Sequence, residues 1–229
     1  MPHVKSFAAA YRKCLCASQL QRLSFGSGQR AMSARSASPA PRGNAPSVRT
    51  VNLGQGEKAI TRMAVSFDGT ILVYAVKDEH GETLYSWTGS AGPGRVVGAA
   101  KSVGGMAVTQ NGGVIVADRG ANEVFAVWDL RGAASRQFLA DARDGVSAPA
   151  GVNTSPRNDI YVANGGSVIV LDSAGHVKHS QACNCAPTGV SWVRESLFRL
   201  TDRGDQTVYL VDGGADDRIF FVPPPLVTP

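Results

Sequence analysis

From residue 47 onward, short apolar segments of strand length alternate with polar turns. Four successive stretches begin alike, with a short strand, a tight turn and a longer apolar strand. The first strands are expected over 63–66, 106–109, 151–154 and 189–192, and the second strands over 71–76, 114–117, 160–163 and 197–201. Asp68-Gly69 and Asn111-Gly112 suit the turns, because such pairs supply the positive φ angles of a two-residue hairpin. The pattern therefore predicts antiparallel strand pairs.

Two further strands complete each stretch. Third strands are expected over 83–87, 123–128, 167–171 and 207–211, and fourth strands over 95–98, 137–140, 177–181 and 218–222. The second strands are mostly apolar without alternation, which is typical of strands covered on both faces. Each stretch is thus expected to form a four-stranded sheet packed between neighbouring sheets.

The four stretches are also copies of one another. Asp118-Arg-Gly-Ala-Asn-Glu-Val-Phe-Ala-Val127 matches Asp202-Arg-Gly-Asp-Gln-Thr-Val-Tyr-Leu-Val211, and corresponding positions recur about every 38–46 residues. That period is typical of propeller blades, and helical patterns are lacking. We predict an all-β fold, a β-propeller of about four four-stranded blades over 47–222, followed by a Pro-rich tail at 223–229. A β-sandwich is the structural alternative, but it would not explain the self-similarity.

The number of blades indicates an incomplete ring. Closed propellers usually have four to eight blades. Residues 47–53 read as the outer strand of a preceding blade, although the fourth repeat has an outer strand of its own at 218–222. This count favours an N-terminally shortened larger ring over a closed ring of four.

The positive charge of the chain is concentrated in residues 1–46. This Ser-, Ala- and Arg-rich segment holds seven of the 23 Lys and Arg residues and no Asp or Glu, which leaves 16 basic and 18 acidic residues for the rest. We expect a disordered basic tail; a transit peptide and a basic binding arm are the alternatives, and no secretory signal is recognisable. The repeats lack the basic stripe of a nucleic-acid binder, and no apolar run nears the roughly 20 residues that span a bilayer.

The repeat resembles a known family of blades. The pattern Gly-x-Ala-Val-x-x-x-Gly-x-Val-x-Val-Ala-Asp-x-x-x-x-x-Val, at residues 105–124, resembles the NHL-type repeat of six- and seven-bladed propellers. This resemblance implies an extracytoplasmic or scaffolding role. The stretch Cys183-Asn-Cys-Ala-Pro-Thr-Gly189 also looks like the last blade of uncharacterised bacterial propeller proteins, in the wider six-bladed superfamily that includes TolB-like propellers.

The related gluconolactonase family is enzymatic. Resemblance to it would imply a divalent metal in the central channel, held in part by an Asn just before the Gly that opens each first strand. At those positions this chain has Gly104, Ala150 and Thr188, which supply no carboxylate or amide oxygen. We therefore predict no metal and no other cofactor.

One end of the blades carries the candidate site. The turns between second and third strands and the connections between blades should emerge on one rim, where the candidate residues are Asp118, Arg119, Asn164, Asp202 and Arg203. Arginines there would offer planar, bidentate donors to a carboxylate or phosphate. The alternative is that the Asp and Asn side chains only cap tight turns, and repetition of one dipeptide at equivalent turns favours it.

The folded region holds one cysteine pair, Cys183 and Cys185, in the connection between the third and fourth blades. Structural zinc sites use pairs spaced by two to four residues together with a second pair of ligands, which we do not find. Free thiols or a disulfide between the two are the favoured states.

No catalytic motif appears along the chain. We find no Gly-x-Ser-x-Gly elbow, no Walker loop and no dinucleotide-binding fingerprint. The sequence therefore favours a non-catalytic binding or interaction module for a protein or small-molecule ligand. A lactonase-like hydrolase and a truncated, non-functional product are the alternatives.

Overall fold

The computed structural model describes residues 58–89, 93–183, 185–194 and 197–203, together with the backbones of four short strands outside those ranges. The chain divides into two compact units, Met1–Asn52 and Leu53–Pro229. Within the first unit, β1 (Met32–Ala34) pairs antiparallel with β2 (Arg49–Val51). β2 lies inside the strand expected over 47–53, but it belongs to a two-stranded sheet with β1 and not to a blade.

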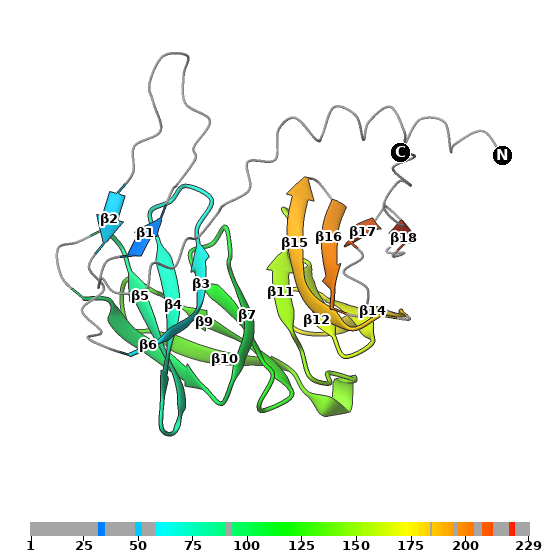
Figure 1. Ribbon diagram of the computed structural model, residues 1–229, viewed down its shortest axis with the longest axis horizontal. Coiled ribbons are helices and arrows are strands. Elements are labelled where there is room, and N and C mark those ends of the chain that lie inside the picture. Colours follow the sequence, from blue (N-terminus) through cyan, green and yellow to red (C-terminus); the bar gives the residue numbers. More distant parts are fainter. Residues whose placement is uncertain are drawn as a thin grey trace, which may run out of the picture. The chain divides into compact units, whose positions relative to one another are not determined.

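The second unit consists of four-stranded antiparallel blades, as the repeat predicted (Figure 1). Blade 1 contains β3 (Ile60–Val65), β4 (Leu72–Asp78), β5 (Gly81–Trp87) and β6 (Arg95–Ala100). Blade 2 contains β7 (Val103–Val108), β8 (Val114–Asp118), β9 (Glu123–Trp128) and β10 (Ser135–Ala140). Blade 3 contains β11 (Gly151–Thr154), β12 (Ile160–Asn164), β13 (Ser167–Leu171) and β14 (Val177–Ala182). Blade 4 contains β15 (Pro187–Arg194), β16 (Leu197–Asp202), β17 (Val208–Asp212) and β18 (Phe220–Val222).

Apolar cores fill the spaces between successive blades. Ile71, Val116 and Phe125 belong to the core between blades 1 and 2, and a second core of this kind lies between blades 2 and 3. Between blades 3 and 4, Tyr161 stacks on Phe198 with ring centroids 3.9 Å apart. All residues of β8 and β12 are buried, which confirms the two-sided covering expected of the second strands in blades 2 and 3. Each buried large side chain contributes about 1.5–3 kcal/mol.

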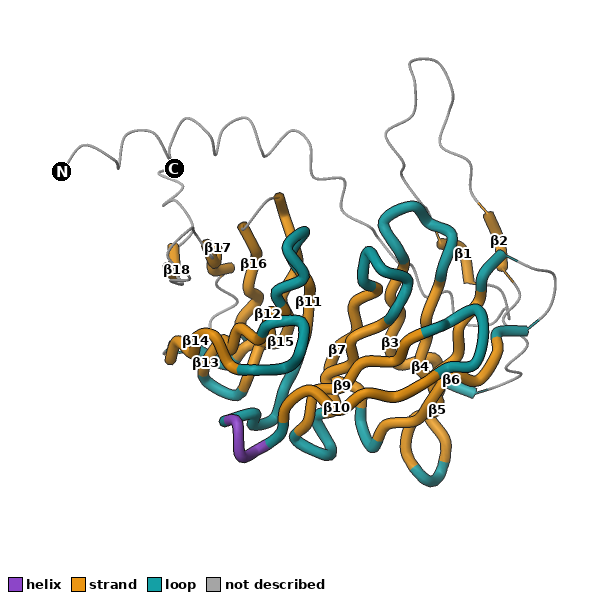
Figure 2. The backbone as a smooth tube through the Cα atoms, turned by 180° about the vertical axis from the view of Figure 1, so that it is seen from behind, coloured by secondary structure: helices purple, strands orange, loops and turns teal. Residues whose placement is uncertain are grey.

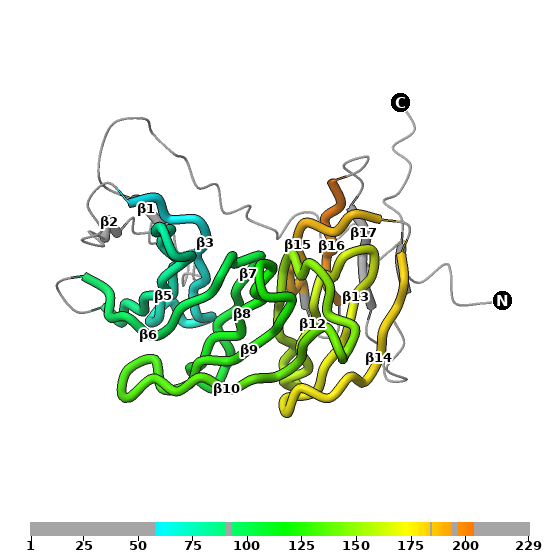
Figure 3. The backbone as a smooth tube through the Cα atoms, turned by 90° about the horizontal axis from the view of Figure 1, so that it is seen from below, coloured from blue at the N-terminus to red at the C-terminus, as the bar shows by residue number. Residues whose placement is uncertain are grey.

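The first strands of consecutive blades, β3, β7, β11 and β15, lie side by side, and the blades follow one another along the chain (Figure 3). Glycine permits this approach. A Cβ added at Gly105 would lie 2.7 Å from Gly151 Cα, and one added at Gly151 would lie 2.7 Å from Gly189 Cα. No side chain fits at such distances, so glycine is a packing requirement at positions 105 and 151.

Helix is nearly absent from the described part of the chain. A single 3-10 turn, Ala142–Asp144, lies in the connection between blades 2 and 3 (purple in Figure 2). Among the described residues, no helix has the length and apolar character needed to cross a membrane.

Candidate functional site

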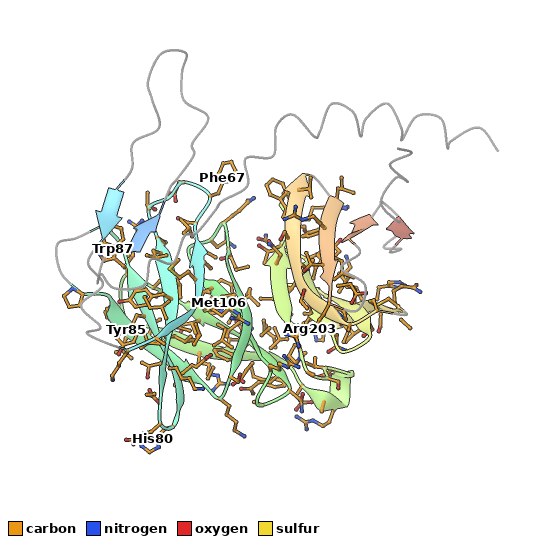
Figure 4. All side chains as sticks on the ribbon, viewed as in Figure 1. Phe67, His80, Tyr85, Trp87, Met106 and Arg203 are labelled. Atoms are coloured by element: carbon orange, nitrogen blue, oxygen red, sulfur yellow. A yellow bond between two sulfur atoms is a disulfide. The ribbon has the colours of Figure 1, made fainter. Side chains whose placement is uncertain are left out.

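The blades have two distinct ends, which Figure 4 marks with two labelled residues of blade 1. His80 lies in the turn between β4 and β5, and Phe67 lies at the opposite end, in the turn between β3 and β4. We call the first end the linker rim. It comprises the ends of β4, β8, β12 and β16, the turns that follow β4, β8 and β12, Arg203 after β16, and the described residues of the connections at 101–102, 141–150 and 183–186. All five candidate site residues belong to the linker rim.

Asp118, at the end of β8, fixes the connection that enters its own blade. Its carboxylate accepts hydrogen bonds from the backbone N–H groups of Lys101 at 2.7 Å and Ser102 at 2.9 Å. It also accepts from Gly120 at 2.9 Å and Ala121 at 3.1 Å, within its own turn. Both carboxylate oxygens of Asp118 thus accept from backbone N–H groups, and the residue is only 1% exposed.

The same contact recurs in blades 3 and 4. Asn164 Oδ1 accepts from the N–H of Ser147 at 2.6 Å, and Asp202 Oδ1 accepts from the N–H of Ala186 at 2.7 Å. Asn164 is buried, and its Nδ2 also donates to the carbonyl of Gly145 at 3.0 Å.

A second hydrogen bond returns across each of these contacts. In each blade, the residue after the Asp or Asn donates its N–H to the carbonyl of the connection residue that the Asp or Asn accepts from. The pairs are Arg119 to Ser102 at 2.7 Å, Gly165 to Ser147 at 2.7 Å and Arg203 to Ala186 at 3.0 Å. We call this reciprocal pair of hydrogen bonds the linker clasp. It satisfies backbone groups that would otherwise be left without partners at the rim. Asp118, Asn164 and Asp202 therefore hold the connections that enter their blades, and Asp118 and Asn164 also form hydrogen bonds within their own turns.

The arginines beside the clasp are in a different situation. Arg119 and Arg203 are both exposed. Among the described residues, neither lies within ion-pair distance of a carboxylate. The neighbouring Asp118 and Asp202 carboxylates accept hydrogen bonds from backbone N–H groups. The structure thus brings the five predicted residues to equivalent rim positions and leaves the two guanidinium groups facing solvent.

Arg62 is a rim residue that the sequence analysis did not single out. It pairs with Ala75 in the register where Gly105 pairs with Ala117, so an arginine stands at the repeated glycine position in blade 1. Its Nε donates to the carbonyl of Gly104 at 3.0 Å, and its Nη1 donates to the carbonyl of Thr61 at 2.8 Å. The sequence signal that could have identified Arg62 is that an arginine stands where the aligned repeats have glycine.

Cys183 and Cys185 are joined by a disulfide, with Cα atoms 5.2 Å apart. The N–H of Cys183 donates to the carbonyl of Gly166 at 2.9 Å, and Cys185 packs against the core between blades 3 and 4. The disulfide therefore closes a small loop next to the blade 4 clasp. In the part of the chain that the structure describes, no three His, Cys, Asp or Glu side chains gather as metal ligands would.

No family model and no curated protein matches the sequence. Solved structures do match in fold. A luciferin-regenerating enzyme aligns with a TM-score of 0.62 at 14% identity, covering 85% of this chain and 77% of that one. A streptogramin B lyase aligns with a TM-score of 0.60 at 10% identity, covering 84% and 61%. A gluconolactonase from Xanthomonas campestris aligns with a TM-score of 0.55 at 16% identity, covering 85% and 65%.

These likenesses show the fold, and the chain is a β-propeller of the architecture shared by gluconolactonase-like and streptogramin-lyase proteins. It spans less than two thirds of the length of the lyase and of the gluconolactonase. The low identities carry no activity from those enzymes to this chain.

Proposed function

We propose that this propeller is a binding module whose linker rim holds an acidic ligand, a carboxylate or phosphate group, through Arg119 and Arg203. The observation that carries the proposal is the position of these residues. Each follows a clasp residue at the end of a second strand, and each is exposed and without an ion-pair partner among the described residues.

The clasp supports this role because it fixes the backbone from which each arginine extends. Arg119 N and Arg203 N both donate to the connection that enters the blade, so the start of each side chain is held in place. A guanidinium group offers a planar fork of donors that matches carboxylate and phosphate oxygens. Arg62, near the start of β3, adds a further positive charge at the same end of the blades.

The positions that could serve a lactonase reaction do not favour that alternative. Gly104 and Ala150 have no side-chain oxygen. The hydroxyl of Thr188 is already engaged, since its Oγ1 lies 3.0 Å from Thr201 Oγ1. Binding is therefore a better match to the described rim than hydrolysis.

Calorimetric titration of the full chain with citrate and with inorganic phosphate, at low salt, tests the proposal. We expect at least one anion to bind, and the double substitution Arg119→Ala with Arg203→Ala to weaken binding by about tenfold or more, because charged hydrogen bonds of about 1.5–3 kcal/mol are lost. Arg157→Ala is the matched control, because Arg157 is an exposed arginine in the turn between β11 and β12, at the opposite end of the blades.

Three outcomes would contradict the proposal. The first is that neither anion binds the wild-type chain. The second is that the double variant binds like the wild type. The third is that Arg157→Ala weakens binding as strongly as loss of a rim arginine, which would indicate a general charge effect.

A further inference from the structure

A hollow of about 550 Å³ lies at the end of blades 1 and 2 that is opposite to the linker rim. Its walls are the turns that precede β4 and β8 and the turn between β9 and β10. Ile71 and Leu130, both buried, line its floor. The volume is within the range of small-molecule sites, about 300–1,000 Å³. The arginines of the proposed acidic-ligand site are at the other end of the blades.

Phe67 stands at the edge of this hollow and is 88% exposed (Figure 4). The equivalent turn of blade 2 has Gln110 at this position, and that of blade 3 has Pro156. An aromatic ring at a solvent-exposed turn presents a large apolar face to water. Its position beside a hollow provides a surface on which a flat apolar face of a ligand could pack.

The turn that carries Phe67 is firmly held. The N–H of Ser66 donates to the carbonyl of Ile71 at 2.9 Å, and the N–H of Gly69 donates to the carbonyl of Ser66 at 2.9 Å. The Asp68 carboxylate accepts from Ser66 Oγ at 2.6 Å and from the N–H of Thr70 at 3.0 Å. These hydrogen bonds, that from Ser66 most of all, lower the pKa of Asp68 to about 2. Phe67 is therefore presented by a preorganised turn.

The polar groups around the hollow fall into two sets. Asp68 and Asp129 are committed to their own turns, Asp129 through a hydrogen bond of 2.7 Å from the N–H of Gly132. Arg131 reaches across from blade 2, where its Nη2 donates to Thr70 Oγ1 at 3.0 Å. The carboxamides of Gln110 and Asn111 are exposed, and neither forms a hydrogen bond with another described residue.

We propose that this hollow binds a neutral saccharide. The ring of Phe67 would pack against the C–H face of a sugar, while the free carboxamides of Gln110 and Asn111, each both donor and acceptor, would bind its hydroxyl groups. The lining carboxylates of Asp68 and Asp129 accept hydrogen bonds within their own turns, and Arg131 beside them offsets part of their negative charge. One arginine, itself engaged with Thr70, is a weak match for an anion.

Saturation-transfer NMR and calorimetric titration of the full chain with cellotriose, maltotriose and laminaritriose test this site. We expect at least one trisaccharide to bind, and Phe67→Ala to weaken its binding by about tenfold or more, because the stacking face is removed. Phe67→Trp keeps an aromatic face and is expected to bind within about threefold of the wild type. Gln110→Ala is expected to weaken binding by a smaller factor than Phe67→Ala.

Phe138→Ala is the matched control, because Phe138 is 49% exposed on β10 and does not line the hollow. Unchanged binding in this variant, with loss in Phe67→Ala, supports the site. The proposal is overturned if none of the three trisaccharides binds, or if Phe67→Ala and Phe138→Ala weaken binding equally. Because Phe67 is exposed, Phe67→Ala should unfold at the wild-type temperature, so lost binding would not reflect lost folding.

Discussion

Gly151→Ala is expected to lower the free energy of unfolding by about 1–3 kcal/mol or more, whereas Gly189→Ala is expected to change it by less than about 1 kcal/mol. The two glycines occupy the same register position in β11 and β15, opposite Ala163 and Thr201. They differ in what a methyl group would meet. At Gly151 it would lie 2.7 Å from Gly189 Cα and 3.0 Å from the N of Val190, which are backbone atoms of the next blade.

Among the described residues, Thr201 Oγ1 alone would lie within reach of the methyl group added at Gly189, at 3.4 Å, an ordinary contact distance. Backbone atoms in a packed sheet cannot move aside as a flexible side chain can, so the cost at Gly151 includes displacement of β15. Urea unfolding monitored by far-UV circular dichroism measures both variants against the wild type. An equal loss in the free energy of unfolding for the two variants would contradict this difference, because it would indicate that a methyl group at Gly189 also meets backbone atoms.

Asp118→Ala is expected to be more damaging, with a loss of about 2–4 kcal/mol in the free energy of unfolding. The substitution removes the acceptor of four backbone N–H groups, and those of Lys101 and Ser102 belong to the connection that enters blade 2. These bonds are partly buried, so N–H groups that lose their acceptor there carry a desolvation cost in addition to the lost hydrogen bonds. The bonds from Arg119 N and Gly120 N to Ser102 O, at 2.7 and 3.4 Å, would remain.

Asp118→Asn provides the comparison, because Asn164 fills the same role in blade 3 with one amide oxygen. We expect this variant to lose less than half as much stability as Asp118→Ala, since the N–H of Ser102 keeps an acceptor. The same unfolding measurement applies. A wild-type urea midpoint for Asp118→Ala would show that the carboxylate does not hold the connection.

The strands could be predicted because each depends on local sequence. Continuous apolar runs such as 114–117 and 160–163 gave strands buried on both faces, and Asp-Gly and Asn-Gly pairs marked the turns. The first strand of blade 1 was expected over 63–66, but β3 covers Ile60–Val65. β7 and β15 likewise begin earlier than expected, at Val103 and Pro187, so the local apolar pattern does not mark the first residues of these strands.

The sites were harder to read, because their contacts join distant residues. The sequence predicted that Asp118 caps its own turn. Its carboxylate also accepts hydrogen bonds from Lys101 and Ser102, 17 and 16 residues earlier, in the connection between blades 1 and 2. The saccharide hollow brings the turn of Phe67 to Arg131, which bonds to Thr70 across 61 residues. No local pattern encodes these contacts, which arise only when two blades pack side by side.

Amide hydrogen exchange of Ser102, Ser147 and Ala186, resolved by NMR, tests most directly whether the repeats form equivalent blades joined in the same way. Each of these N–H groups donates to the Asp or Asn that ends the second strand of its blade. We expect all three amides to exchange far more slowly than unprotected loop amides, although they lie in connections between blades. Exchange of any one of them at the rate of an open loop would contradict a clasp repeated from blade to blade.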